Sequence, residues 1–202
     1  MSTAELKYTV LEVSENFVRG RLDLKDAAIL HDSIRKEVKN QNFQLGLTGD
    51  IEEEHEADFE ARSSSIYWLV KSKKARNMSL QLAHAINDEY FNLEIDEGHP
   101  PDVQFTVYQD YDDHYDWHQD QYTEEDYDGF KRNLSFSLCL SPTDFYEGAE
   151  FFIKDGNERN VRVFKMRYGE FIFFPSDVEH KVNALRSGAR ESLVIWYGLL
   201  DE

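Results

Sequence analysis

The second half of the chain consists of short apolar or alternating runs that are separated by turn residues. The runs cover residues 103–108, 115–118, 133–140, 150–154, 161–165, 170–174, 180–184 and 191–199. Turn-forming pairs such as Ser141-Pro142 and Asp155-Gly156 lie between them. Short runs at regular spacing with turns between them are typical of the strands of a sandwich or barrel. The pattern therefore predicts a mainly β protein with a double-stranded β-helix, or jelly-roll, fold.

The N-terminal half carries two helical patterns. In the first, apolar residues recur three or four apart from Ala27 onward, and either Asp23 or Asp26 before them is a suitable N-cap. The second pattern spans residues 74–91 and has its apolar residues on one side. A helix with one apolar stripe buries that stripe against another layer. We therefore expect flanking helices, in an α+β arrangement, packed on one outer sheet face.

The remaining segments are less regular. Residues 8–18 alternate loosely, which predicts one strand. The sequence pattern of residues 41–65 predicts a long loop, and the acidic centre of this loop at 50–60 is typical of a solvated face. Residues 122–130 interrupt the strands with an acidic, aromatic segment. This segment is a candidate lid, and a plain surface loop is the alternative.

The size and composition favour a single folded domain. The chain has 202 residues, of which 41% are hydrophobic, enough for one sizeable core. We expect one domain over residues 1–202, with a helical support region at 1–100 and the jelly-roll core at 101–202. Cys139 is the single cysteine, so no internal disulfide can form, and its apolar surroundings predict core packing.

The formal net charge of −18 bears on the possible partners. Nucleic acids and anionic membrane surfaces are disfavoured, because both are bound by clustered Lys and Arg. The charge serves solubility, and the alternative is attraction of a basic substrate or of metal cations. Residues 1–10 lack a signal-peptide pattern, and no run is long enough to span a bilayer. We expect a soluble, cytoplasmic protein.

A candidate metal site begins with His118 and Asp120. Two residues apart on a strand, their side chains project from one face. His180, which opens a later strand after the apolar run 171–174, is a candidate third ligand. Two imidazoles and one carboxylate on one side of a metal are typical of non-haem Fe(II) oxygenases. The alternative is a surface strand whose polar positions face outward, since a lone His-x-Asp also arises by chance.

Arg190 lies at the head of the apolar run 193–196. An arginine inside such a strand is costly when it is buried without a partner. A buried carboxylate would satisfy it, because a guanidinium binds a carboxylate in a two-pronged fashion. The alternative is an arginine at the rim that pairs with a local acid such as Glu191. Without the histidines, the sequence favours neither interpretation.

Together these residues resemble the prolyl hydroxylase branch of the 2-oxoglutarate- and Fe(II)-dependent dioxygenases. The resemblance covers about residues 103–198. Residues 171–177 with His180-Lys181-Val182 are similar to the family's segment around its distal histidine, and residues 190–196 are similar to its last core strand. The resemblance implies that His118, Asp120 and His180 hold the iron. It also implies that Arg190 grips 2-oxoglutarate, and these four residues are the expected catalytic set.

The resemblance also implies roles for residues around the metal. Tyr108, ten residues before His118, matches a tyrosine that hydrogen-bonds 2-oxoglutarate. Tyr115, Arg132 and Trp196 match residues on the substrate side. The chain departs from the family at Cys139, where some relatives have a second cosubstrate tyrosine. That departure puts the second cosubstrate contact in doubt.

The implied activity is hydroxylation of a prolyl residue in a peptide or protein, with decarboxylation of 2-oxoglutarate to succinate and CO2. The implied cofactor and cosubstrates are Fe(II), 2-oxoglutarate and O2, with ascorbate as a further expected ligand. A hydroxylase of a free amino acid or small metabolite is the main alternative on the same scaffold. A nucleic-acid demethylase is disfavoured by the charge of −18 and by the lack of a second arginine soon after Arg190. A jelly-roll binding module without catalysis is the alternative outside enzymology, since a fold alone does not give a function.

Overall fold

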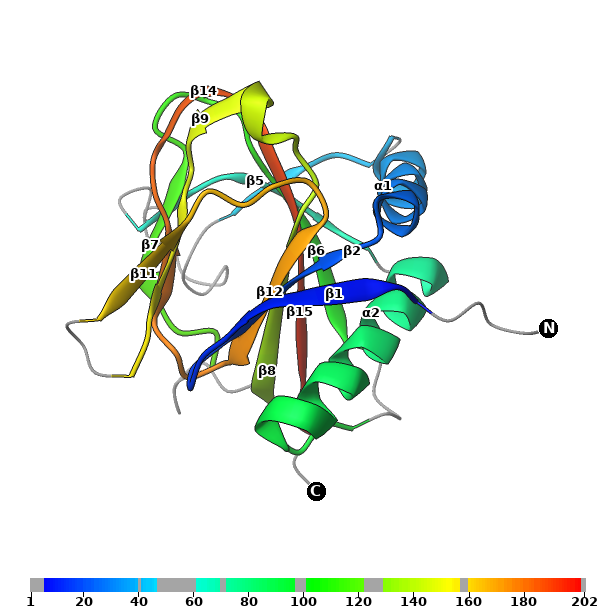
Figure 1. Cartoon of the computed structure of the whole chain (residues 1–202). Coiled ribbons are helices and arrows are strands. Elements are labelled where there is room, and N and C mark those ends of the chain that lie inside the picture. Colours follow the sequence, from blue (N-terminus) through cyan, green and yellow to red (C-terminus); the bar gives the residue numbers. More distant parts are fainter. Residues whose placement is uncertain are drawn as a thin grey trace.

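The computed structural model describes residues 6–39, 41–46, 61–69, 72–96, 101–121, 129–156 and 160–200. Two β-sheets face each other, and two helices lie on the outer side of the larger sheet (Figure 1). The acidic segment at 50–60 lies outside the described residues, and so do residues 122–128 of the expected lid. Within the described residues, no helix combines the length and the apolar character needed to cross a bilayer.

The larger sheet has eight strands. In spatial order they are β1 (Tyr8–Val13), β2 (Val18–Leu22), β12 (Glu170–Pro175), β8 (Phe130–Cys139), β15 (Arg190–Leu200), β6 (Asp102–Tyr108), β5 (Ser65–Trp68) and β3 (Gln44–Leu45). All neighbouring pairs are antiparallel. The long strands β8 and β15 form the centre of this sheet, where most of their residues are buried.

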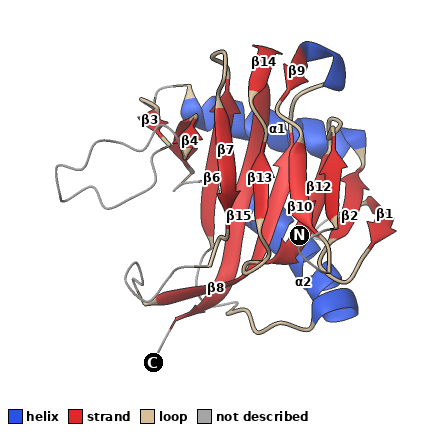
Figure 2. Ribbon diagram, turned by 90° about the vertical axis from the view of Figure 1, so that its left-hand side faces the viewer, coloured by secondary structure: helices blue, strands red, loops and turns tan. Residues whose placement is uncertain are grey.

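The smaller sheet has five strands and lies in front of the larger one in Figure 2. In spatial order they are β11 (Val161–Phe164), β10 (Phe151–Lys154), β13 (His180–Val182), β7 (His114–His118) and β4 (Arg62–Ser63). A separate pair, β9 (Tyr146–Gly148) and β14 (Leu185–Gly188), extends beyond one end of the two sheets. Two facing antiparallel sheets form the predicted jelly roll, and all eight predicted strands are present.

The N-terminal segment at 8–18 was predicted as one strand, and this is wrong. It contains β1, a turn and the first residue of β2, and the turn is closed by a hydrogen bond from Ser14 N to Phe17 O at 2.8 Å. The side chain of Phe17 is fully buried between the sheets. An apolar residue inside a turn preserves the alternating pattern, which hides the chain reversal from a sequence reading.

The predicted loop at 41–65 is also only partly a loop. Its described ends contain β3, β4 and the first residue of β5. Strands of two residues are too short to produce a periodic pattern. The N-terminal half therefore adds strands to both sheets as well as providing the helices.

The two helices are α1 (Leu24–Val38) and α2 (Lys73–Ile86). Asp23 is the N-cap of α1, with its side chain accepting a hydrogen bond from Lys25 N at 2.9 Å. The second predicted helix, at 74–91, is α2 followed by a π-helical turn, η1 (Asn87–Phe91). The turn stops at Asn92, whose left-handed φ of 53° ends the helical path.

The two sides of the larger sheet face two different cores. The outer core joins the sheet to buried residues of α1 and α2, which confirms the prediction that the helices cover this face. The inner core fills the space between the sheets and includes Cys139, which is buried as expected. Residues of the larger sheet that point inward thus meet the smaller sheet, where β7 and β13 lie side by side.

Candidate metal centre

The two candidate histidine ligands lie on neighbouring strands. His118 is the last residue of β7, and His180 is the first residue of β13. The strands are antiparallel and pair these two residues directly. Asp120 lies two residues beyond the end of β7, where its backbone N–H donates to the Ser176 carbonyl at 2.9 Å. Asp120 therefore approaches the histidines from a turn, whereas the sequence pattern had put it on the strand.

The three side chains converge on one point. Their potential ligand atoms all lie within 4.8 Å of one another. Nε2 of His118 is 3.7 Å from Oδ1 of Asp120, and Nε2 of His180 is 3.5 Å from Oδ2. Asp120 and His180 are buried and His118 is partly buried, so the alternative of outward-facing polar positions does not hold. Two imidazoles and a carboxylate are a donor set that suits Fe(II).

The tautomer of each histidine is fixed by the backbone. Nδ1 of His118 donates to the Asp116 carbonyl at 2.7 Å, and Nδ1 of His180 donates to the Val178 carbonyl at 3.0 Å. Because a carbonyl only accepts, each Nδ1 carries a proton, so in the neutral imidazole the lone pair is on Nε2. Such a hydrogen bond on the far nitrogen also fixes the ring orientation in metal sites. Both Nε2 atoms are therefore prepared to bind a cation.

The carboxylate of Asp120 fits the same interpretation. Its Oδ2 is buried and has no hydrogen-bond partner among the described residues. Burial by itself raises the pKa of Asp120, but His180, His118, a hydrogen bond with Ser135 and the charge of Arg132 hold it below its ordinary value. Asp120 is thus an anion with an unsatisfied oxygen that faces the two imidazoles. A buried anionic oxygen without a partner is costly, and a bound cation would satisfy it.

The imidazole of His118 is neutral near pH 7. Burial, followed by the neighbouring His180, lowers the pKa of His118 from 6.5 to about 3. A neutral imidazole is the form that binds a metal. The residues present therefore fit a divalent cation, and their role as its ligands remains a prediction.

Arg190 provides a buried positive charge beside Tyr108, on the inner side of the larger sheet. It is the first residue of β15, its side chain is 1% exposed, and it pairs with Tyr108 at the end of β6. The guanidinium carbon lies 5.5 Å from the Tyr108 ring centroid. Its Nε has no hydrogen-bond partner within the described ranges, and the contact of its Nη1 with Ser192 Oγ is long, at 3.4 Å. In the part of the chain that the structure describes, no carboxylate forms an ion pair with Arg190.

The neighbouring residue Glu191 points the other way. Its carboxylate contacts Nε2 of His31 at 2.9 Å and the guanidinium of Arg35, both on α1. The alternative in which Arg190 pairs with Glu191 at the rim is therefore excluded. Arg190 faces the inner core and Glu191 faces the outer helix, as expected for successive residues of a strand.

The three residues predicted to contact the substrate lie in two places. The Tyr115 ring stacks on His118, with centroids 3.4 Å apart and ring planes 13° from parallel. Arg132 on β8 lies 4.2 Å above the Trp196 ring on β15, and both side chains are mostly buried. Nε1 of Trp196 is a buried donor that finds no hydrogen-bond partner in the described part of the chain. Arg132 and Trp196 thus pack together, and the Nε1–H of Trp196 could donate a hydrogen bond to a ligand.

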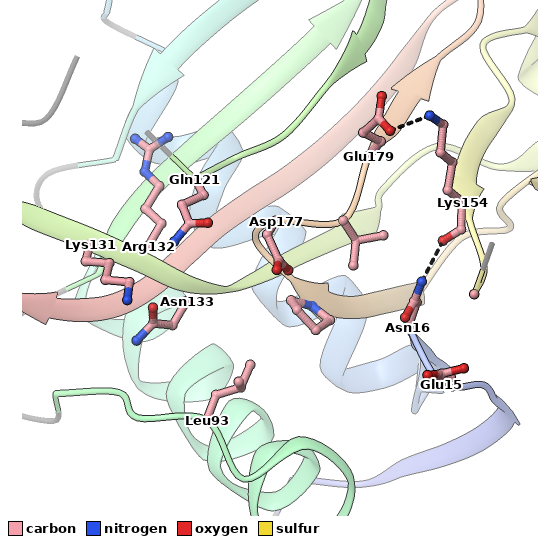
Figure 3. Close-up of a pocket in the computed structure, with 13 residues that line it drawn as sticks. Glu15, Asn16, Leu93, Gln121, Lys131, Arg132, Asn133, Lys154, Asp177 and Glu179 are labelled. Atoms are coloured by element: carbon pink, nitrogen blue, oxygen red, sulfur yellow. Dashed lines mark hydrogen bonds and ion pairs between the residues drawn. The ribbon is translucent and has the colours of Figure 1, made fainter. Parts of the chain in front are cut away.

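A cavity of 650 Å³ adjoins Arg132 and is shown in Figure 3. Arg132 and Gln121 contribute to its wall, and Gln121 directly follows the candidate ligand Asp120. On the other side of the cavity, Lys154 forms an ion pair with Glu179. Most of the residues that line the cavity carry polar or charged side chains.

Sequence reasoning missed two residues of this region. Arg62 on β4 is 8% exposed, and its guanidinium lies 4.5 Å above the Tyr115 ring. Its single sequence signal is its place at the head of the short run 62–69. Tyr146 on β9 is buried, with its hydroxyl donating to Met166 O at 2.7 Å and lying 4.0 Å from Cys139 Sγ. The structure thus puts a phenol beside Cys139, and no pattern in the sequence shows this proximity.

Residues 103–198 match the profile of the 2OG-Fe(II) oxygenase superfamily. This span contains the three candidate metal ligands, Arg190, β8 and all but the last two residues of β15. Over this segment, just under half of the 202 residues, the chain is similar to the 2OG-Fe(II) oxygenase superfamily. The resemblance that the sequence motifs suggested is therefore confirmed at the level of the superfamily.

Curated relatives match this chain over short segments. A PKHD-type hydroxylase of Prochlorococcus marinus is 41% identical over 66 residues, which are 33% of this chain and 29% of that protein. A PKHD-type hydroxylase of Crocosphaera subtropica is 29% identical over 106 residues, which are 52% of this chain and 46% of that protein. The matched segments thus cover less than half the length of either relative.

Solved structures share the fold of this chain at low sequence identity. A prolyl-4-hydroxylase of Pseudomonas putida superposes with a TM-score of 0.69 at 18% identity, covering 92% of this chain and 94% of the other. A prolyl hydroxylase of Trichoplax adhaerens, solved with a peptide fragment of hypoxia inducible factor, gives a TM-score of 0.68 at 15% identity, covering 91% and 84%. These superpositions include the N-terminal half, so its helices and added strands belong to the shared fold.

Proposed function

We propose that this chain is an Fe(II)- and 2-oxoglutarate-dependent dioxygenase that hydroxylates a prolyl residue in a peptide or protein. One observation carries the proposal. The three ligand atoms of His118, Asp120 and His180 converge at one end of the inner core, and the buried cation of Arg190 lies in that core without a carboxylate partner among the described residues. A dicarboxylic cosubstrate that binds the metal at one end and Arg190 at the other would satisfy both groups.

The ligand roles follow from the protonation states. His118 and His180 would hold Fe(II) through their Nε2 lone pairs, and Asp120 through the oxygen that lacks a hydrogen bond. Three ligands on one side of an iron leave positions for a cosubstrate and for O2. When bound, Fe(II) supplies the site at which O2 is activated, with decarboxylation of 2-oxoglutarate to succinate and CO2.

The residues behind the metal centre would orient 2-oxoglutarate. The guanidinium of Arg190 would take the distal carboxylate in a two-pronged contact, and Tyr108 beside it offers a hydroxyl donor. Because both residues are buried in the inner core, the ion pair would form away from water, where its geometry is well defined. A dependence on ascorbate stays a prediction.

Support for a prolyl peptide comes from the relatives and from the second side of the site. The curated relatives are named PKHD-type hydroxylases, and the solved neighbours include prolyl hydroxylases. In this chain, Tyr115 stacks on the candidate ligand His118, and Arg132, which packs on the Trp196 ring, lines the cavity of Figure 3. We assign these three residues to the peptide, with Trp196 Nε1 available to a backbone carbonyl.

The test is turnover of the purified chain with Fe(II), 2-oxoglutarate and O2. Proline-containing peptides and free amino acids are offered separately, and succinate and the mass gain of one oxygen atom are measured. Peptide-dependent succinate with oxygen added to proline supports the proposal. Turnover with free amino acids alone would instead indicate a metabolite hydroxylase. A chain that binds no Fe(II) and consumes no 2-oxoglutarate would be a binding module.

A further inference from the structure

Arg62 is a buried cation next to the candidate metal centre. Its side chain is 8% exposed, and its strand β4 pairs with β7 so that Arg62 lies directly opposite Tyr115. Arg62 forms no ion pair with a carboxylate in the described ranges of the chain. A desolvated charge of this kind needs other compensation. Its compensation comes from hydrogen bonds and from an aromatic ring.

The aromatic contact is part of a stack that ends on a metal ligand. The Tyr115 ring lies 3.4 Å from the His118 ring, at 13° from parallel. The Arg62 guanidinium carbon lies 4.5 Å from the Tyr115 ring centroid. Since the imidazole already covers one face of the phenol, the guanidinium occupies the other face. The order of the stack is therefore guanidinium, phenol, imidazole.

Arg62 itself is fixed from the larger sheet. Its Nε donates to Ser64 Oγ at 3.0 Å, and its Nη2 donates to Gln104 Oε1 at 2.8 Å. Gln104 Oε1 also accepts from Thr106 Oγ1 at 2.9 Å, which holds the amide in place on β6. A Cβ at Gly46 would lie 2.7 Å from Arg62 Nε, so the backbone packs closely over the guanidinium.

These contacts tie the first metal ligand to the opposite sheet. We infer that Arg62 is a positioning residue for the metal centre, which holds the Tyr115 ring against His118 and so fixes the plane of that imidazole. The inference rests on the proposed function, because it takes His118 as a metal ligand. A lysine in place of Arg62 keeps the charge but loses the planar fork that spans Ser64 and Gln104. The stack would then loosen, and His118 would sample orientations that do not bind metal.

The test measures Co(II) binding to the full-length chain without 2-oxoglutarate, by calorimetric titration. Arg62→Lys is expected to weaken Co(II) binding about tenfold. This is within the range typical of substitutions of residues that orient a metal ligand. Tyr115→Leu, which removes the ring, is expected to weaken it to a similar degree. The double variant is expected to bind no more weakly than Tyr115→Leu, because both changes break the same stack. Arg167→Lys, at an exposed position, is the matched control and should bind like the wild type.

Two results would overturn the inference. One is unchanged Co(II) affinity in Arg62→Lys, and the other is a double variant whose loss equals the product of the single losses. If Arg62→Lys does not fold, Ser64→Ala removes one anchor of the guanidinium and should give a smaller loss in the same direction. Failure of the proposed function looks different, since the wild type would then not bind Co(II) or would bind it unchanged after His118→Ala.

Discussion

His180 lies directly opposite His118 in the antiparallel pairing of β13 with β7, and their ring centroids are 4.2 Å apart. The metal centre is thus a product of strand register, since a slip of one residue would turn either ring to the other face of the sheet. Asp120 completes the group from the turn after β7, where its backbone is held by the Ser176 carbonyl. Strand register and this turn together bring the three candidate ligands to one point.

Replacing either histidine should remove the metal and the activity. We expect His118→Ala and His180→Ala to lower 2-oxoglutarate-dependent succinate formation by about 100-fold or more, because loss of a ligand removes more than loss of a residue behind it. Circular dichroism should show a near-native fold. His84→Gln on α2 is the matched control and should keep wild-type turnover. Turnover by His118→Ala near the wild-type rate would contradict the ligand assignment.

Arg190→Met tests whether the arginine serves 2-oxoglutarate binding or the stability of the protein. Loss of the guanidinium should raise the 2-oxoglutarate KM by about 30-fold or more, since removing one partner of a buried charge pair costs about 2–5 kcal/mol. Without cosubstrate, the same change should leave Tm unchanged or raise it, because the described residues give this buried cation no ion pair. Thermal unfolding with and without 2-oxoglutarate measures both effects.

One outcome would contradict a role of Arg190 in cosubstrate binding. A fall in the Tm of the cosubstrate-free Arg190→Met variant, with an unchanged 2-oxoglutarate KM, would mean that the arginine is structural. Glu191→Gln, a change of the adjacent residue that faces α1, controls for disturbance of β15 and should leave the KM unchanged.

Glu191 should make stability depend on pH. Burial by itself raises the pKa of Glu191, but the hydrogen bond from His31 and the charge of Arg35 outweigh it and hold the pKa below its ordinary value. A carboxyl whose pKa is lower in the folded state stabilises the protein above its unfolded pKa, and this contribution is lost as pH falls through the folded pKa. Glu191→Gln should therefore lower the free energy of unfolding by about 1 kcal/mol at pH 7.

The pH dependence is checked by urea unfolding at a series of pH values. The difference between wild type and Glu191→Gln should shrink as pH falls below the ordinary pKa of a glutamate, about 4.3, because the unfolded chain then takes up a proton that the folded carboxyl binds more weakly. Glu147→Gln, at an exposed position, is the control and should change stability little at any pH. A difference that stays constant down to pH 3 would show that the charge of Glu191 is not involved.

Gly148 should tolerate no side chain. Its φ is +78°, and a Cβ there would lie 2.2 Å from the Ala184 carbonyl oxygen across the pairing of β9 with β14. Gly148→Ala combines a left-handed backbone with a backbone clash, so we expect a loss of about 2 kcal/mol or more in the free energy of unfolding. Gly129→Ala, also at positive φ but with open space around it, should cost less. Equal losses of the free energy of unfolding in the two variants would show that the structure relieves the clash in Gly148→Ala.

Much of the fold could be predicted from the local pattern of apolar residues in the sequence. The alternating runs predicted all eight core strands, because a strand places successive side chains on opposite faces and only one face is buried. The stripe that begins at Ala27 predicted α1 and its covering of the sheet. The same rule placed His118 and Asp120 toward a common side, even though Asp120 lies just beyond the strand.

The tertiary structure decided which of these pieces meet. Local pattern shows which face of a strand is buried, but not which strand lies next to it, because pairing depends on hydrogen bonds between residues far apart in sequence. That is why the opposition of His180 and His118, the isolation of Arg190 from Glu191, and the contact of Arg62 with Tyr115 appear only in three dimensions. The sequence determined the strands and the chemical groups that they carry. Register and sheet packing determined that these groups share one site.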